Sequence, residues 1–173
     1  FVIRQASISY AWSIRTLQEQ MLSPGNARGF AGFFLSGGRQ QPSLNNVAAE
    51  QKGIAAVVPG GTWYNDREAT ASALRQTLQT SAVVHISSHA FSGKEAEQVP
   101  HIELYDQPFY LFELKALRQH PSLVVLSACR TGDGRMVMGE GVQSLARAFT
   151  AEGAGAVVAG WWNVNDAAAA RLM

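Results

Sequence analysis

The sequence is poor in cysteine, with one in 173 residues, so no disulfide can form within the chain. A reducing compartment, the cytoplasm, is therefore expected. Charged residues make up only 16% of the chain and the net charge is +1, which gives no general attraction to nucleic acid or to an acidic membrane. The sequence also lacks an apolar run long enough to span a bilayer and a signal segment at its start. We therefore expect a cytoplasmic domain that contacts neither nucleic acid nor membrane.

Hydrophobic residues, by contrast, make up 47% of the chain, which is typical of a globular protein and argues against disorder. A chain of this length fits one domain and can bury roughly 70% of the surface that its unfolded state exposes. The sequence begins at Phe1 without a methionine and ends at Met173 inside a helical pattern. We therefore expect residues 1–173 to be a single domain cut from a longer chain, with elements missing at both ends.

Apolar, β-branched runs alternate with segments of helical period along the chain. The runs predict strands and the periodic segments predict helices. Expected strands cover residues 7–11, 32–36, 82–87, 122–127 and 154–162, and expected helices cover residues 45–58, 67–80, 112–119 and 141–152. Residues 59–66 read as a turn-rich connection, and residues 88–110 as irregular apart from a β-ribbon. The repeated strand–helix–strand order predicts an α/β fold, a three-layer α/β/α sandwich with a mainly parallel sheet.

Two of the expected strands end in reactive side chains. His89 follows the strand in "VVHISSHA", and Cys129 follows the strand in "LVVLSAC". Because the carboxyl ends of parallel strands lie at one edge of the sheet, both side chains are expected at that edge. If the strands are neighbours, about 4.8 Å apart, the imidazole and the thiol can approach each other. An imidazole can stabilise a thiolate and later protonate a leaving group, so the pair is a candidate for nucleophilic catalysis.

Other interpretations of these residues remain open. A single cysteine is often only a small hydrophobic core residue, which is the alternative for Cys129. His85 shares a strand face with His89 by the two-residue period and is expected to be a hydrogen-bonded core residue, or one that supports the catalytic groups, and not the base itself. His101 and His120 are expected at the surface. No cluster of Cys and His has the spacing of zinc ligands, and "GDGRMVMGEG" lacks the end of a phosphate-binding loop. No metal or cofactor is therefore expected.

Three segments, "VVHISSHA", "LVVLSACRTGDG" and "GEGVQSLARAFTAEGAGAVVAGWWNVNDAAAARLM", follow one another in the chain. Together they resemble the CHAT domain, a caspase-like cysteine peptidase family that is often fused to tetratricopeptide repeats. They are also similar to the protease domain of separase. The resemblance is strongest over residues 82–173 and weaker over residues 7–81, where "ISYAWS" resembles an early strand and the helix after it. It implies a caspase-like fold.

The resemblance also implies roles for individual residues. His89 matches the catalytic histidine of the family and Cys129 its nucleophile. The oxyanion of the reaction would be bound by the backbone N–H groups of Ala90 and Cys129. The family pattern has glycine where Ala90 stands. If the backbone there required a positive φ, alanine would cost about 1 kcal/mol or distort the oxyanion hole.

For substrate binding the resemblance points to three further residues. Asp166 matches an aspartate that lines the pocket for the residue before the scissile bond, where a carboxylate would select arginine or lysine. Its alternative role is a helix N-cap. Glu140 also matches a family position, but an acid at a helix start is favourable for dipole reasons alone. Trp162 could line the cleft or pack in the core.

The sequence therefore predicts a cysteine endopeptidase that cleaves a protein or peptide substrate, and the match of Asp166 points to a basic residue before the cleaved bond. A regulatory protein or a fused repeat domain is expected to control it. The alternative is a catalytically silent caspase-like module that acts in interactions or signalling. A small-molecule α/β hydrolase would need a Gly-x-Ser-x-Gly turn, and the sequence has none.

Overall fold

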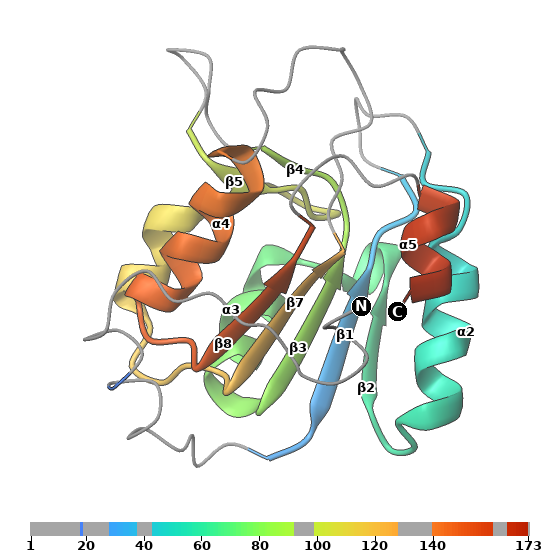
Figure 1. Cartoon of the computed structure of the whole chain (residues 1–173), viewed down its shortest axis with the longest axis horizontal. Coiled ribbons are helices and arrows are strands. Elements are labelled where there is room, and N and C mark those ends of the chain that lie inside the picture. Colours follow the sequence, from blue (N-terminus) through green and yellow to red (C-terminus); the bar gives the residue numbers. More distant parts are fainter. Residues whose placement is uncertain are drawn as a thin grey trace, which may run out of the picture.

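A five-stranded parallel sheet forms the centre of the fold in the computed structural model (Figure 1). The structure describes residues 18, 28–37, 43–91, 99–127, 140–160 and 166–172. The strands follow the order β2-β1-β3-β7-β8 across the sheet. Their bounds are β1 Phe30–Phe34, β2 Thr62–Asn65, β3 Val83–Ser87, β7 Leu123–Ser127 and β8 Ala156–Ala159. All four neighbouring pairs are parallel, so the described strands of this sheet share one carboxyl edge.

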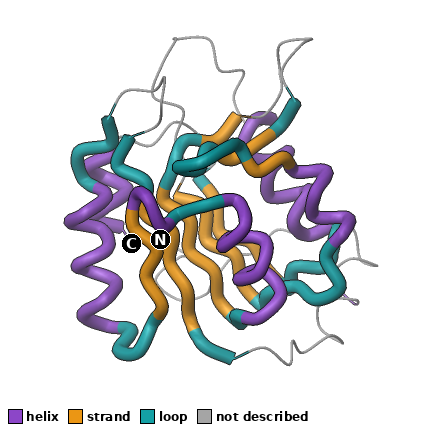
Figure 2. The backbone as a smooth tube through the Cα atoms, turned by 180° about the vertical axis from the view of Figure 1, so that it is seen from behind, coloured by secondary structure: helices purple, strands orange, loops and turns teal. Residues whose placement is uncertain are grey.

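Helices cover the sheet and form the outer layers (Figures 1 and 2). Helix α2 packs on β1 and on α5. On the other face, α3, α4 and the 3-10 helix η3 share one hydrophobic core with β3 and β7. The bounds are α2 Val47–Val57, α3 Ala71–Thr80, η3 Leu111–Ala116, α4 Glu140–Ala151 and α5 Asp166–Leu172, with a short 3-10 helix η2 at Asp66–Glu68. The predicted three-layer α/β/α sandwich with a mainly parallel sheet is confirmed.

The side chains of β3 point alternately to the two faces of the sheet, and each face has its own hydrophobic core. Val84 and Ile86 are fully buried and belong to the core under α3 and α4. His85, between them in sequence, stacks on Phe34, which belongs to the second core under α2. Successive residues of a strand point to opposite faces, so a strand buried on both faces contains almost no exposed position. This is why β3 lacks the regular alternation with exposed polar residues that a half-buried strand shows.

Helix α3 shows how local sequence sets an element's start. The Thr70 hydroxyl accepts a hydrogen bond from the Ala73 N–H at 3.2 Å, which is an N-cap contact. The Asp106 carboxylate accepts a second from the Ala71 N–H at 2.9 Å. Leu74 and Leu78 lie one turn apart on the buried face. The helix is therefore capped twice and anchored by its apolar stripe.

Helix α4 ends as its glycine predicts. Gly153 has a φ of 110°, and the Ala154 N–H donates back to the Phe149 carbonyl at 2.9 Å. This six-to-one bond is typical of a Schellman motif, which needs a residue with positive φ. A side chain at Gly153 would also lie 2.9 Å from Cδ2 of His120. Glycine is thus required for its conformation and for its small size.

A small antiparallel sheet follows directly after β3. It comprises β4 Ala90–Phe91, β5 His101–Ile102 and β6 Phe109–Tyr110. Ile102 and Phe109 are fully buried and join the core under α3. A row of ring contacts crosses this sheet from Phe91 through His101 to Tyr110 and ends at Phe112 in η3, with centroids 4.8, 5.6 and 5.4 Å apart. The small sheet therefore packs as a continuation of the main core.

Most predicted elements are confirmed, with two corrections. The predicted connection 59–66 contains β2, whose register with β1 pairs Ala31 with Thr62. This edge strand is short, and glycine precedes it, so its turn-forming neighbours dominate the pattern. The predicted helix 112–119 is the 3-10 helix η3. The predicted strand 7–11 lies outside the described residues.

Candidate active site

The strands that carry His89 and lead to Cys129 are direct neighbours. β3 and β7 pair in parallel, with Val83 opposite Leu123 and Ser87 opposite Ser127. His89 comes two residues after Ser87, and Cys129 comes two residues after Ser127. Cys129 itself lies outside the described residues. The expectation that these two strands end side by side at one edge of the sheet is confirmed.

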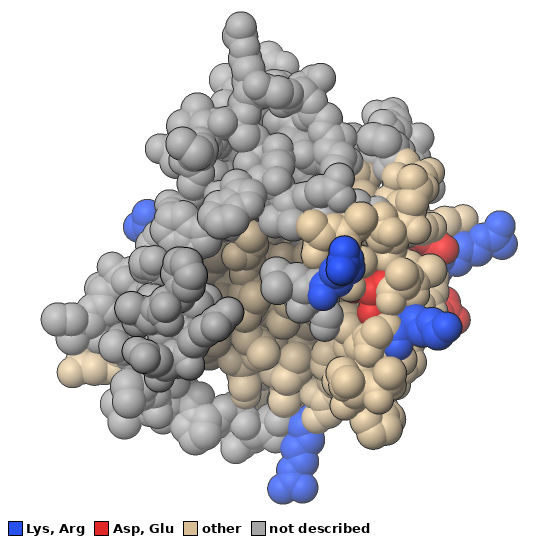
Figure 3. Space-filling view, turned by 45° about the vertical axis from the view of Figure 1, so that its right-hand side comes forward, with Lys and Arg blue, Asp and Glu red and all other residues tan. Residues whose placement is uncertain are grey.

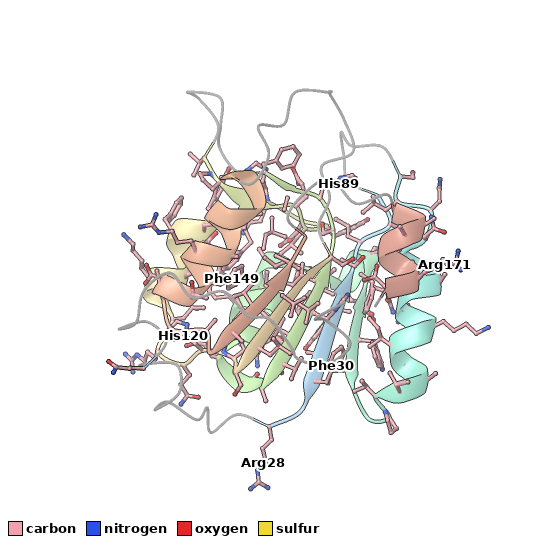
Figure 4. The ribbon with its side chains drawn as sticks, in the orientation of Figure 1. Arg28, Phe30, His89, His120, Phe149 and Arg171 are labelled. Carbon is pink, nitrogen blue, oxygen red and sulfur yellow. The ribbon has the colours of Figure 1, made fainter. Side chains whose placement is uncertain are left out.

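His89 lies at the carboxyl edge of the sheet (Figure 4) and is 1% exposed. Two contacts with Glu103 fix the backbone around it. The His89 carbonyl accepts a hydrogen bond from the Glu103 N–H at 2.9 Å, and the Ser88 hydroxyl donates to the Glu103 carbonyl at 2.5 Å. Since both Ser88 and His89 are buried, these bonds form away from water and hold this turn of chain firmly.

Ala90 has ordinary backbone geometry. Within the described part of the chain, Asp66 is the one non-glycine residue with a positive φ, at 38°. Ala90 pairs with Ile102 in the antiparallel ladder, and the bond from Glu103 to His89 flanks this pair. Such a flanking bond marks a pair that does not exchange hydrogen bonds itself. The Ala90 N–H is therefore not used in the ladder with β5, and alanine fits its position without strain.

The structure gives only helix positions for the expected substrate-binding residues. Glu140 is the first residue of α4 and Asp166 the first residue of α5. An acid in the first turn of a helix is favourable because the helix dipole is positive there. The position of Glu140 agrees with the dipole alternative, whereas an N-cap would stand just before the first helical residue. The N-cap role of Asp166 and the pocket roles of both residues stay predictions. Trp162 lies outside the described residues.

The remaining histidines lie away from this edge or within the small sheet. His101 packs between Phe91 and Tyr110, and its Nε2 lies 3.4 Å from a Glu103 carboxylate oxygen. His120 lies far from His89 (Figure 4), and its ring lies next to Gly153. Burial lowers the pKa of His120 below 6.5, and the Glu152 carboxylate partly opposes this. Both are half-buried, so they lie at the surface, as expected, and are partly covered by their neighbours.

A buried polar cluster on the α2 face was not predicted as a set. Its members are Glu50, His85 and Ser87, each at most 2% exposed. The Glu50 carboxylate accepts hydrogen bonds from His85 Nε2 at 2.8 Å and from the Ser87 hydroxyl at 3.0 Å. The expectation that His85 is a hydrogen-bonded core residue is confirmed. Glu50 could have been found in the sequence, since it shares the helical face of Val47 and Ile54, the other buried residues of α2.

A second unpredicted feature lies where β1 and β2 end. Asp66 follows β2 and accepts hydrogen bonds from both the backbone N–H and the hydroxyl of Ser36, at 2.9 and 2.7 Å. Its φ of 38° is unusual for a residue other than glycine. The two bonds compensate for that conformation and join the ends of two neighbouring strands. Nothing in the local sequence signals a pairing across 30 residues.

The described surface carries no strong electrostatic signature on the face shown in Figure 3, where Lys and Arg side chains are scattered. No group of three or more potential metal ligands occurs among the residues that the structure describes. Within the same residues, no helix is long and apolar enough to cross a membrane.

A central parallel sheet with helices on both faces, and a histidine turn leading from a middle strand into a small antiparallel sheet, defines an α/β protein of caspase-like type. The chain belongs to the CHAT domain family, since the sequence model of that family matches residues 1–173. This family is related to the caspase-like cysteine peptidases. Among curated proteins, a sequence comparison finds no match.

Proposed function

We propose that this CHAT domain is a cysteine endopeptidase with Cys129 as the nucleophile and His89 as its acid–base partner. One observation carries the proposal, the register of β3 and β7. Ser87 lies opposite Ser127 in neighbouring parallel strands. His89 and Cys129 each follow by two residues, so continuation of the same register would bring the imidazole and the thiol together.

In the proposed reaction, His89 accepts the thiol proton of Cys129, and the thiolate attacks the carbonyl carbon of the scissile peptide bond. The tetrahedral intermediate collapses to a thioester, and the imidazolium gives its proton to the leaving amine. Water, deprotonated by His89, then attacks the thioester and releases the acid product and the free thiol. No metal or cofactor takes part in these steps.

The Ala90 N–H is proposed as one oxyanion donor, together with the Cys129 N–H. The ladder between β4 and β5 leaves the Ala90 N–H unused. Its neighbour His89 is held on the carbonyl side by the Glu103 N–H. A preorganised backbone donor stabilises developing charge without having to reorient, which is the main requirement for an oxyanion hole.

The proposal also covers the substrate specificity of the peptidase, its location and the control of its activity. A carboxylate at Asp166 would select a basic residue before the scissile bond through a charge-assisted hydrogen bond, while Glu140 and Trp162 would contribute to the same cleft. We place the protein in the cytoplasm, where its single thiol stays reduced. A regulatory protein or a fused repeat domain would set its activity.

The pH dependence of thiol alkylation tests the dyad, because the chain has one cysteine. A thiol activated by an imidazole is half-maximally reactive below about pH 7.5, and a free thiol near pH 8.5. We expect the lower midpoint in the wild type and the higher one in His89→Ala. The midpoint is a better measure than the rate at pH 7, since a less basic thiolate is also a weaker nucleophile.

His120→Ala serves as the matched control, since His120 is remote from His89 (Figure 4). It should keep the wild-type midpoint. Cleavage of a peptide library in parallel should be lost in Cys129→Ala and His89→Ala. Equal midpoints in the wild type and His89→Ala would refute the dyad. Cleavage after acidic or apolar residues would refute the proposed role of Asp166.

A second candidate function is a silent interaction module, and the burial of His89 favours it. At 1% exposure the imidazole cannot be reached by a substrate in this conformation. The peptidase therefore requires the site to open when it is activated. A wild-type midpoint near pH 8.5 with no cleavage, both alone and with candidate activating proteins, would support the silent module.

A further inference from the structure

The buried cluster of Glu50, His85 and Ser87 joins helix α2 to the strand that carries His89. Every buried side-chain nitrogen and oxygen has a hydrogen-bond partner among the residues that the structure describes, so the cluster is complete. The two oxygens of the Glu50 carboxylate divide their bonds between His85 and Ser87. A single helical side chain therefore contacts β3 at two successive positions of one strand face.

The surroundings of the cluster make these bonds strong constraints. The His85 ring stacks against Phe34, with centroids 5.5 Å apart, and against Phe30 at 6.5 Å. The rest of the buried face of α2 is apolar, contributed by Val47 and Ile54. Apolar contacts tolerate small slides of a helix along a strand, whereas hydrogen bonds to a buried carboxylate fix the distance between specific atoms. The cluster thus adds two fixed contacts with α2 to the sheet pairings that hold β3 in position along its axis.

The location of the cluster relates it to the candidate active site. His85 and Ser87 lie four and two residues before His89. Ser87 is also the residue of β3 that lies opposite Ser127, two residues before Cys129. A shift of β3 along its axis would therefore move the histidine relative to the cysteine by the same amount.

We propose that Glu50, His85 and Ser87 act as positioning residues that set the placement of His89 relative to Cys129. This inference rests on the proposed function, since it concerns the geometry of the same dyad. The cluster does not contact substrate. It acts through the backbone of β3, from the face opposite the core that contains Val84 and Ile86.

Substitutions at His85 separate positioning from simple stabilisation. His85→Leu removes the bond to Glu50, and His85→Gln places an amide N–H near the position of the imidazole Nε2. We expect His85→Leu to lower kcat by about 10- to 100-fold, because a misplacement of about 1 Å has effects of this size, with KM changed less than about 2-fold. The alkylation midpoint should move toward that of His89→Ala. His85→Gln should restore most of both.

Leu78→Ala is the matched control for lost stability. Leu78 is fully buried near the end of α3, close to where β3 begins, so it lies in the core but away from the carboxyl edge. This substitution should lower the melting temperature and leave both kcat and the alkylation midpoint as in the wild type. Where His85→Leu does not fold, Ser87→Ala replaces it, since it removes one bond and only one oxygen atom.

The outcomes distinguish failure of the proposed peptidase function from failure of the positioning role alone. A midpoint that is independent of His89 refutes the proposed function, and the positioning role with it. A midpoint that depends on His89 but is unchanged in folded His85→Leu or Ser87→Ala refutes the positioning role alone. Equal loss of kcat in Leu78→Ala and His85→Leu would also refute it, because the effect would then follow stability.

Discussion

Replacement of Ala90 by glycine tests whether the departure from the family pattern has a cost. Ala90 has a negative φ and is 7% exposed in the main hydrophobic core. Glycine there gains nothing from its freedom at positive φ and loses more conformational entropy on folding, by about 0.5–1 kcal/mol. It also removes a buried methyl group, worth about 0.8 kcal/mol. Ala90→Gly should therefore lower the free energy of unfolding by about 1.5 kcal/mol.

Urea denaturation measures this change directly. The midpoint should fall with an unchanged slope, since the surface exposed on unfolding is nearly the same. A loss of about 1.5 kcal/mol corresponds to a decrease of about 3–6 °C in melting temperature for a chain of this size. Ala154→Gly provides the comparison, because Ala154 is 1% exposed and also has a negative φ. The two variants should lose similar amounts.

Ala90→Gly should also leave peptidase activity no higher than in the wild type, since the N–H proposed for the oxyanion hole is already unstrained. An unchanged or higher stability would refute the argument, because it would mean that alanine is strained at this position. A several-fold increase in kcat would refute it as well, by showing that the alanine distorts the oxyanion hole.

Three further predictions concern stability. Gly153→Ala should lower the free energy of unfolding by at least about 1 kcal/mol, because φ is 110° and the new methyl would lie 2.9 Å from His120; equal urea midpoints would contradict the glycine requirement. Thr70→Ala should cost about 1 kcal/mol by removing the cap of α3, while Thr80→Ala, at the exposed end of the same helix, should cost less in the same urea experiment. Because burial lowers the pKa of His120 in the folded state, the unfolded chain takes up its proton first as the pH falls below about 6.5, and the His120 contribution to stability decreases. His120→Gln should therefore show a smaller loss of stability between pH 7.5 and 5.5 than the wild type; an equal or larger loss would contradict this assignment.

The parts of the fold that depend on local pattern could be predicted from the sequence. β3 and β7 are runs of buried residues, and the order of strands and helices determined a parallel sheet. Gly153 signalled the end of α4 because only its backbone conformation is needed there. β2 was missed because an edge strand with half-buried aromatic residues resembles a loop when glycines precede it.

In the candidate site, too, local features could be predicted from the sequence and contacts between distant residues could not. His89 was predicted because the end of a strand is a local feature. The contacts that hold its turn of chain are not local, since they join His89 and Ser88 with Glu103, and the nearby bond between Glu50 and His85 also links distant residues. Such pairings depend on how α2 and the small sheet pack, which no short segment encodes. Asp66 is a further example, since its partner Ser36 lies at the end of another strand.

The parallel pairing of β3 with β7 also has a consequence for how the chain folds. Paired residues in these strands are forty positions apart, and those of β1 and β3 more than fifty. To form such pairings the chain must first close long loops, which costs conformational entropy before any contact is gained. Proteins built from them therefore fold slowly for their size, in milliseconds to seconds. The edge that carries His89 is complete only after this central pairing. A newly made chain would therefore acquire the candidate site only once this long-range pairing has formed.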